Sequence, residues 1–164
     1  MPIKNDPVDN VSKPNNTEIV SWDEKYATGI ELIDSQHKEL ISLTNKLFQA
    51  CLEGNDAVTV AFKEAMSHMV EYVRLHFAAE EKFQQHINYP KYPEHKKQHE
   101  DMVKLILETV KDYSEGRKFV PNNFVRSLRD WILSHIAVYD KDYATYAADQ
   151  KNKGLISDND LEIS

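Results

Sequence analysis

The chain has 164 residues, of which 41% are hydrophobic and 29% are charged, and its formal net charge is -7. This composition predicts one globular domain with a sizeable core, and the negative charge argues against nucleic acid or an anionic membrane as the main partner. No apolar run approaches the length that spans a bilayer, so we expect no membrane insertion. Because the N-terminal residues lack the apolar stretch of a secretory signal and Cys51 is the only cysteine, we expect a cytoplasmic protein.

Both ends of the chain are predicted to lie outside the folded domain. Residues 1–20 are rich in Asn, Pro, Asp and Lys and cannot bury enough surface to offset the entropy of ordering, so we expect a flexible polar tail. The next residues differ, because Trp22, Tyr26 and Ile30 can pack, and they are predicted to form an ordered arm against the domain. Residues 151–164 are acidic and are predicted to be loose. Either tail is a possible contact for a protein partner, which the sequence does not identify.

Between the tails, four segments repeat apolar residues with the 3.6-residue period of amphipathic helices. The first is capped by Asp34 or Ser35 and ends at Gly54, the second begins near Asp56, and the third begins at Pro93. The expected ranges are 35–53, 56–87, 93–114 and 121–148. Since no strand-like alternation of any length occurs, we predict an all-α fold, an antiparallel up-down-up-down four-helix bundle that occupies residues 21–150 together with the arm.

Seven potential metal ligands lie on the apolar faces of these helices: His37, His76, Glu80, His95, His99, His135 and Asp140. Counting from the helix ends, with a rise of about 1.5 Å per residue, places all seven at one end of the bundle. Two pairs among them are spaced four residues apart and so project from one helix face. His135 and Asp140 are five residues apart, so both reach the bundle interior only if they flank its axis or if the helix widens there into a π-bulge.

A single histidine on an apolar stripe is more often a core or boundary residue than a metal ligand. A set of seven is different, because burying it without metal would leave unpaired polar atoms that cost about 1–3 kcal/mol each. The other two histidines, His68 and His86, have no partner at ligand spacing and are predicted to lie at the surface or its boundary. The charge-rich residues 94–101 are predicted to be solvated apart from their two histidines.

The chemistry of the ligand set indicates which metal it suits. The set is mostly nitrogen, which disfavours magnesium and calcium, and the lack of a cysteine cluster disfavours structural zinc. Two carboxylates that can bridge, combined with imidazoles, suit a pair of iron ions. Ferritin-like carboxylate proteins carry Glu-x-x-His motifs on two helices, and no Glu in this chain is followed by His at the third position.

At these residues the sequence resembles the hemerythrin family, in particular its bacterial single-domain members. The resemblance covers about residues 21–148 and includes Trp22 and the stretches GIELIDSQHKEL, HFAAEE, YPEHKKQH and WILSHIAVYDKDY. It implies a four-helix bundle that holds two iron ions (Fe²⁺ or Fe³⁺) joined by an oxo or hydroxo bridge. By this resemblance one iron is held by His95, His99 and His135, and the other by His37 and His76. Both irons are bridged by Glu80 and Asp140.

The same resemblance implies reversible binding of dioxygen, end-on as a hydroperoxide, at the one iron that keeps an open position. Reversibility requires that water stays out, so the surrounding pocket should be apolar. Residues one turn from the open-site ligands are expected to line it, although plain core packing also accounts for their apolar character: Leu40, Phe77, Met102, Trp131 and Ile132. Tyr143, three residues after Asp140, is expected to hydrogen-bond to a bridging carboxylate.

Three functions are compatible with such a centre. The protein is an oxygen carrier, store or delivery protein, or a module that senses oxygen or redox state, or a di-iron enzyme that reduces NO or peroxide. The sequence offers no acid or base beyond the ligand set to support catalysis. We therefore expect dioxygen binding rather than enzyme activity.

Overall fold

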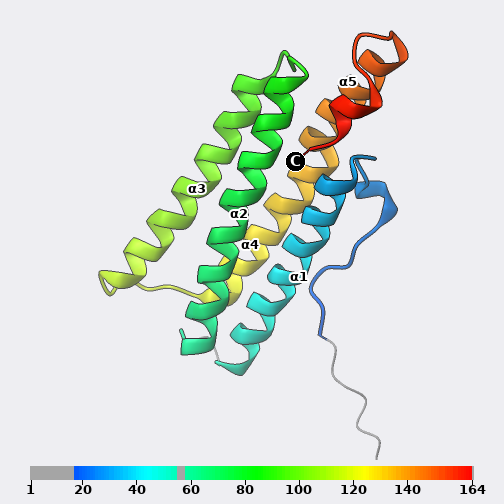
Figure 1. Cartoon of the computed structure of the whole chain (residues 1–164). Helices are drawn as coiled ribbons and strands as arrows, with labels where there is room; N and C mark the ends of the chain where they lie inside the picture. The colour runs from blue at the N-terminus through cyan, green and yellow to red at the C-terminus, as the bar shows by residue number, and fades with distance from the viewer. Residues whose placement is uncertain (1–16, 55–57, 164) are drawn as a thin grey trace, which may run out of the picture.

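The computed structural model describes residues 17–54 and 58–163, and within them the chain is a four-helix bundle without strands (Figure 1). The fold predicted from the sequence is confirmed. Its first three helices are α1 (Glu31–Glu53), α2 (Val60–His86) and α3 (Tyr92–Ser114). The fourth is built from α4 (Pro121–Ser134), a π-helix η2 (His135–Asp140) and α5 (Lys141–Asn152). Two short 3₁₀ helices flank the bundle, η1 (Glu24–Tyr26) and η3 (Asp158–Leu161).

The π-helix confirms the widening that the five-residue spacing of His135 and Asp140 suggested. It spans six residues and buries His135, Ile136 and Asp140, while Val138 and Tyr139 between them remain exposed. A regular α-helix would place His135 and Asp140 about 140° apart around the axis, so the wider turn brings both toward the bundle interior. The helix therefore departs from regular geometry at the point where it carries two of the seven candidate ligands.

The first helix begins earlier than expected. Its N-cap is Ile30 rather than Asp34 or Ser35, and Asp34 lies inside the first turn. The Asp34 carboxylate instead accepts hydrogen bonds from the backbone N–H groups of Thr28 (2.7 Å) and Gly29 (3.0 Å) and from the Thr28 hydroxyl (2.7 Å). It therefore fastens the incoming arm to the helix that carries His37, and its negative charge lies favourably near the helix N-terminus.

The second helix begins at Val60, later than predicted, whereas Pro93 lies in the first turn of the third helix as predicted. The hydroxyl of Thr59 accepts a hydrogen bond from the backbone N–H of Phe62 and caps α2, and the predicted start at Asp56 lies outside the described residues. The turn between α2 and α3 passes through Asn88, whose φ of 53° is one that asparagine tolerates better than most residues. Pro93 lies in the first turn of α3, where a missing N–H group costs no hydrogen bond.

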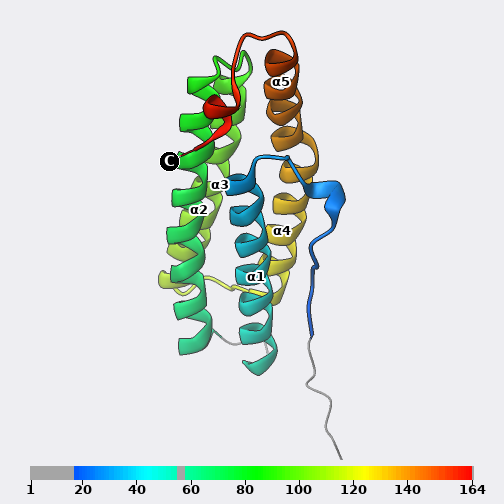
Figure 2. The same ribbon diagram turned by 45° about the vertical axis from the view of Figure 1, so that its right-hand side comes forward.

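The tails differ in part from the prediction. Most of the predicted tail 1–20 lies outside the described residues, but the backbone N–H groups of Ile19 and Val20 donate to the Asn45 side chain on α1. The C-terminal segment, expected to be loose, forms η3 and packs the half-buried Leu161 and Ile163 against the bundle. Figure 2 shows this segment returning from the far end of α5 toward α2. The prediction overlooked the apolar residues that alternate with the acidic ones.

The core consists of two apolar clusters, and the seven candidate ligands lie between them. The larger cluster includes Phe62 and Val125, and also Leu40, Phe77 and Ile136 beside the predicted ligands. The smaller cluster lies at the end with the α2–α3 turn and includes Phe83 and Tyr143. Within the described residues, no helix is both long and apolar enough to cross a membrane.

The bonds made by Asp34 generate a first prediction. Asp34→Ala should lower the melting temperature of the protein by about 4 °C, because it leaves the N–H groups of Thr28 and Gly29 without their acceptor and costs about 1–2 kcal/mol. Glu31→Ala is the matched control, since Glu31 is an exposed acid in the same first turn with no such bonds. Equal melting temperatures for the two variants would contradict the role of Asp34.

Candidate metal centre

All seven predicted ligands converge on one buried site. They form two groups of ligand atoms that each lie within 4.8 Å of one another and that share Glu80. None of the seven side chains is more than 3% exposed. The members come from all four helices of the bundle. The first group is Glu80, His95, His99 and His135, and the second is His37, His76, Glu80 and Asp140.

Three imidazoles of the first group point their Nε2 atoms at one spot. The Nε2 atoms of His95 and His99 are 3.1 Å apart, those of His99 and His135 are 3.1 Å apart, and those of His135 and His95 are 3.3 Å apart. Nitrogen ligands that bind one metal ion at about 2.1 Å lie about 3.0–3.4 Å from one another in octahedral or tetrahedral geometry. The triangle therefore has the size that a shared metal ion requires.

The two carboxylates lie between the groups. Asp140 is 3.1 Å from His37 Nε2 through one oxygen and 3.2 Å from His135 Nε2 through the other. Glu80 is 3.5 Å from His37 Nε2 and 3.2 Å from His99 Nε2, again through different oxygens. His76 Nε2 lies 3.6 Å from the same Glu80 oxygen that contacts His99. Asp140 thus offers one oxygen to each side, and Glu80 also contacts histidines of both groups, as a bridging ligand must.

Outer hydrogen bonds fix the orientation of three of the rings. The Nδ1 atoms of His76 and His135 lie 3.0 and 3.1 Å from the side-chain oxygens of Gln36 and Gln98. His99 Nδ1 lies 3.1 Å from a carboxylate oxygen of Glu81. Because these oxygens only accept, Nδ1 carries the proton and the Nε2 lone pair faces the site, as metal binding requires.

None of the three acceptors was predicted from the sequence, and Gln98 corrects the prediction that residues 94–101 are solvated apart from their histidines. Gln36 is buried, whereas Gln98 and Glu81 are half-buried. The available signal was their position, since Gln36 and Gln98 each immediately precede a predicted ligand and Glu81 immediately follows one. His68 and His86 are exposed, as expected.

Aromatic residues complete the site. The Tyr143 hydroxyl donates a hydrogen bond to Glu80 at 2.7 Å, so it contacts a carboxylate of the site as expected. Its partner is Glu80, although Asp140 is nearer in the sequence. Two residues predicted as pocket lining also stack on histidines. The Phe77 ring lies 3.7 Å from that of His99, and the Trp131 ring lies 4.4 Å from that of His135.

A small cavity adjoins the site, with a volume of about 10 Å³. All five predicted pocket residues line it: Leu40, Phe77, Met102, Trp131 and Ile132. The rest of the lining comes from three candidate ligands, His76, His135 and Asp140, and from three further apolar residues, Val73, Leu128 and Ile136. A cavity of this size accommodates about one water-sized molecule. Its lining has no charged side chain outside the seven.

The protein alone does not satisfy the polar atoms of the site. Among the described residues, both ring nitrogens of His37, both carboxylate oxygens of Asp140 and one oxygen of Glu80 have no hydrogen-bond partner. They are close to one another, but the contacts are not aligned as hydrogen bonds. Unsatisfied buried polar groups cost about 1–3 kcal/mol each. The orphaned carboxylate oxygens and one ring nitrogen of His37 therefore fit metal cations that accept their lone pairs.

In the absence of metal, burial and neighbouring charges shift the pKa values of these residues in opposite directions. Burial lowers the pKa of His76 to about 4. Burial also opposes the charged form of His37, but the adjacent carboxylates of Asp140 and Glu80 raise the pKa of His37 to about 9. For Glu80, burial would raise the pKa, yet the neighbouring histidines hold it well below the usual range.

These shifts predict how the stability of the metal-free protein depends on pH. A lowered histidine pKa gives stability that is lost as pH falls from about 6.5 to about 4, which for His76 amounts to about 3 kcal/mol. A raised pKa gives stability that is lost as pH rises from about 6.5 through about 9, as for His37. Metal-free protein should therefore be most stable near pH 6.5.

The free energy of unfolding, measured by urea titration of chelator-treated protein between pH 5 and pH 9, checks this. His37→Gln should reduce the loss of stability above pH 6.5 and leave the loss below it. Part of the loss above pH 6.5 should remain, because the carboxylates around His99 raise its pKa against the effect of burial. A stability that rises steadily through pH 8 in the unsubstituted protein would be inconsistent with these shifts.

Comparisons with known proteins agree with the site. Residues 28–147 match the family model described as the hemerythrin HHE cation binding domain. A bacteriohemerythrin of Methylococcus capsulatus is 29% identical over 119 residues, which cover 73% of this chain and 88% of that protein. One of Pseudomonas aeruginosa is 30% identical over 122 residues, covering 74% and 77%. A crystal structure of wild-type hemerythrin matches with a TM-score of 0.71 at 27% identity, covering 77% of this chain and 96% of the other. This chain belongs to the hemerythrin family.

Proposed function

We propose that the protein binds dioxygen reversibly at a non-haem di-iron centre and acts as an oxygen carrier, store or delivery protein. The observation that carries the proposal is the pair of ligand groups that share a carboxylate and leave buried polar atoms unsatisfied. Family membership supports iron as the metal. The ligand chemistry agrees, because imidazoles and bridging carboxylates suit iron.

In this proposal His95, His99 and His135 hold one iron, and His37 and His76 hold the other. Glu80 and Asp140 would be shared between the two, in keeping with the contacts that each makes to histidines of both groups. When bound, the iron pair supplies the electrons for reversible oxygen binding. The part of the protein is to orient the imidazoles through Gln36, Glu81 and Gln98 and to hold Glu80 through Tyr143.

The small cavity beside His76 is the proposed position of dioxygen. His76 belongs to the group with two histidines. If both carboxylates are shared, that group would supply two imidazoles where the other supplies three, which would leave room at its iron. Leu40, Met102 and Ile132 cover the cavity and exclude water, which would otherwise promote irreversible oxidation. Since the cavity offers no acid or base besides the seven ligands, its chemistry favours binding over catalysis.

Purified protein expressed with adequate iron should contain two iron ions per chain. After reduction it should bind oxygen in air, release it under inert gas, and repeat this over several cycles, because the buried site excludes water. Metal analysis and visible absorption measure both properties. One equivalent of zinc without iron would overturn the metal assignment. If the protein instead oxidises once and cannot be reduced back by removing oxygen, yet steadily consumes NO or peroxide, it is an enzyme rather than a carrier.

The cavity lining should control the rate of irreversible oxidation. Leu40→Asn places an amide in the cavity and should speed loss of the oxygenated form about tenfold, a difference of about 1.4 kcal/mol in the barrier, with unchanged iron content. Leu43→Asn is the matched control, since Leu43 is a buried leucine of the same helix outside the cavity lining. Equal oxidation rates in the two variants would show that the cavity does not protect the oxygenated form.

A further inference from the structure

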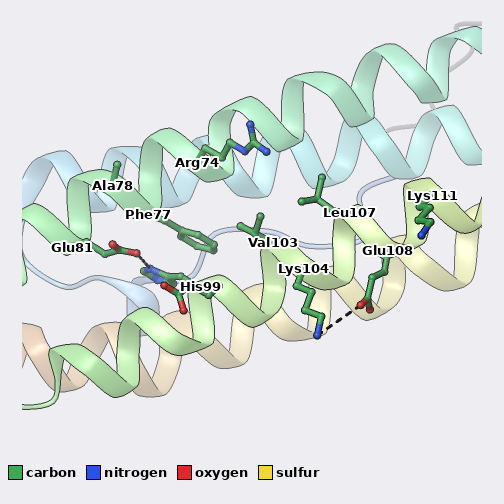
Figure 3. Close-up of a pocket in the computed structure, with 11 residues that line it drawn as sticks. Arg74, Phe77, Ala78, Glu81, His99, Val103, Lys104, Leu107, Glu108 and Lys111 are labelled. Carbon is green, nitrogen blue, oxygen red and sulfur yellow. Dashed lines mark hydrogen bonds and ion pairs between the residues drawn. The ribbon is translucent and has the colours of Figure 1, made fainter.

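A second hollow lies between α2 and α3, toward the end of the bundle remote from the seven ligands. This α2–α3 groove has a volume of about 590 Å³. Its apolar wall includes Phe62, Met66, Val70, Leu107, Val110 and Phe119. At Arg74 and Leu107 it meets a neighbouring hollow that runs toward His99. Figure 3 shows that neighbouring hollow, with Arg74 on α2 and Leu107 on α3.

The apolar wall of the groove is open to solvent. Leu107 and Val110 of α3 are 47% and 46% exposed, whereas Ile106 of the same helix is 2% exposed. The groove is closed at its remote end by aromatic rings, since Phe119 lies 6.0 Å from both Phe62 and Tyr113. An apolar trough of this kind gains free energy when a ligand replaces water along it.

The charges of the groove favour an anion. Two cations line it, Lys63 and Arg74, against one carboxylate, Glu71, in a chain whose net charge is -7. In the part of the chain that the structure describes, Arg74 makes no side-chain ion pair or hydrogen bond, and Figure 3 marks none between its guanidinium and the other residues drawn. The ammonium group of Lys63 lies 5.7 Å from the centre of the Tyr113 ring and forms no ion pair with any carboxylate among the described residues. The guanidinium of Arg74 is therefore available to a carboxylate.

We infer that the α2–α3 groove binds a free long-chain carboxylate, with its acyl chain along α2 and its carboxylate at Arg74. The volume lies in the range of small-molecule pockets, about 300–1,000 Å³, which favours a small ligand over a folded partner. Phe62 and Arg74 are twelve residues apart on α2, a distance of about 18 Å along the helix, so the trough has the elongated form that an acyl chain needs. This site is separate from the proposed oxygen site.

Calorimetric titration of the iron-loaded full chain with monomeric dodecanoate tests the inference. One molecule should bind per chain. Arg74→Gln should weaken binding about three- to tenfold through loss of the charge, with Arg126→Gln on α4 as the control that loses the same charge elsewhere. Leu107→Glu should weaken it at least about tenfold, because it places an anion beside Arg74 in the apolar wall.

Leu105→Glu is the matched control for the second variant. Leu105 lies on the same helix with a similar exposure, 49% against 47%, but does not line the groove. Unchanged visible absorption establishes that each variant keeps its iron site. Equal binding of dodecyltrimethylammonium, or equal effects of the two leucine variants, would overturn the inference.

Two other outcomes would also overturn it. If dodecanoate does not bind and Leu107→Glu turns a dimer into a monomer in light scattering, the groove is an interface between two copies of the chain. If the protein binds phosphatidylglycerol vesicles but not monomeric dodecanoate, the groove contacts a membrane surface instead.

Discussion

The structure depends on one constraint, which is that seven polar side chains lie at the centre of a bundle where almost no water reaches them. Burying an imidazole or a carboxylate without a partner costs free energy, and here the orphaned atoms of His37, Glu80 and Asp140 are neighbours. Two cations placed among them would satisfy the orphaned carboxylate oxygens and one ring nitrogen of His37. The free energy of folding at this end of the bundle is therefore coupled to the free energy of metal binding.

Several local features serve this constraint. The π-helix adds a residue to one turn so that His135 and Asp140 both face inward, although such a turn is uncommon in helices. Asp34 ties the arm to the start of the helix that carries His37. Tyr143 joins the small apolar cluster to Glu80. Together these features hold His37, Glu80, His135 and Asp140 in place before metal binds. They therefore reduce the conformational entropy that is lost when metal binds.

Much of the fold and the centre of the site could be predicted from the sequence, because both follow from periodicity. Ligands such as His76 and Glu80 lie on apolar stripes, and counting residues from the turns placed them at one height. The outer partners could not be predicted in this way. Gln98 and Glu81 lie among charged residues that usually face water, and only the positions of neighbouring helices reveal that they reach His135 and His99. The start of α1 at Glu31 was missed because Asp34 resembles a helix cap in sequence while it binds a preceding turn in space.

The sharing of carboxylates has a consequence for how the site assembles. Glu80 contacts histidines of both groups, and Asp140 lies between His37 on one side and His135 on the other. A cation in either group would therefore fix Glu80, and a cation in the group of His37 and His76 would also fix Asp140 and neutralise part of the charge of both carboxylates. Fixing them lowers the entropy cost of the second ion, whereas neutralising them weakens its attraction. One oxygen of Glu80 already accepts a hydrogen bond from Tyr143, but the second oxygen of Asp140 would remain unsatisfied until the other group is filled. The cost of leaving that oxygen unpaired favours occupation of both groups together.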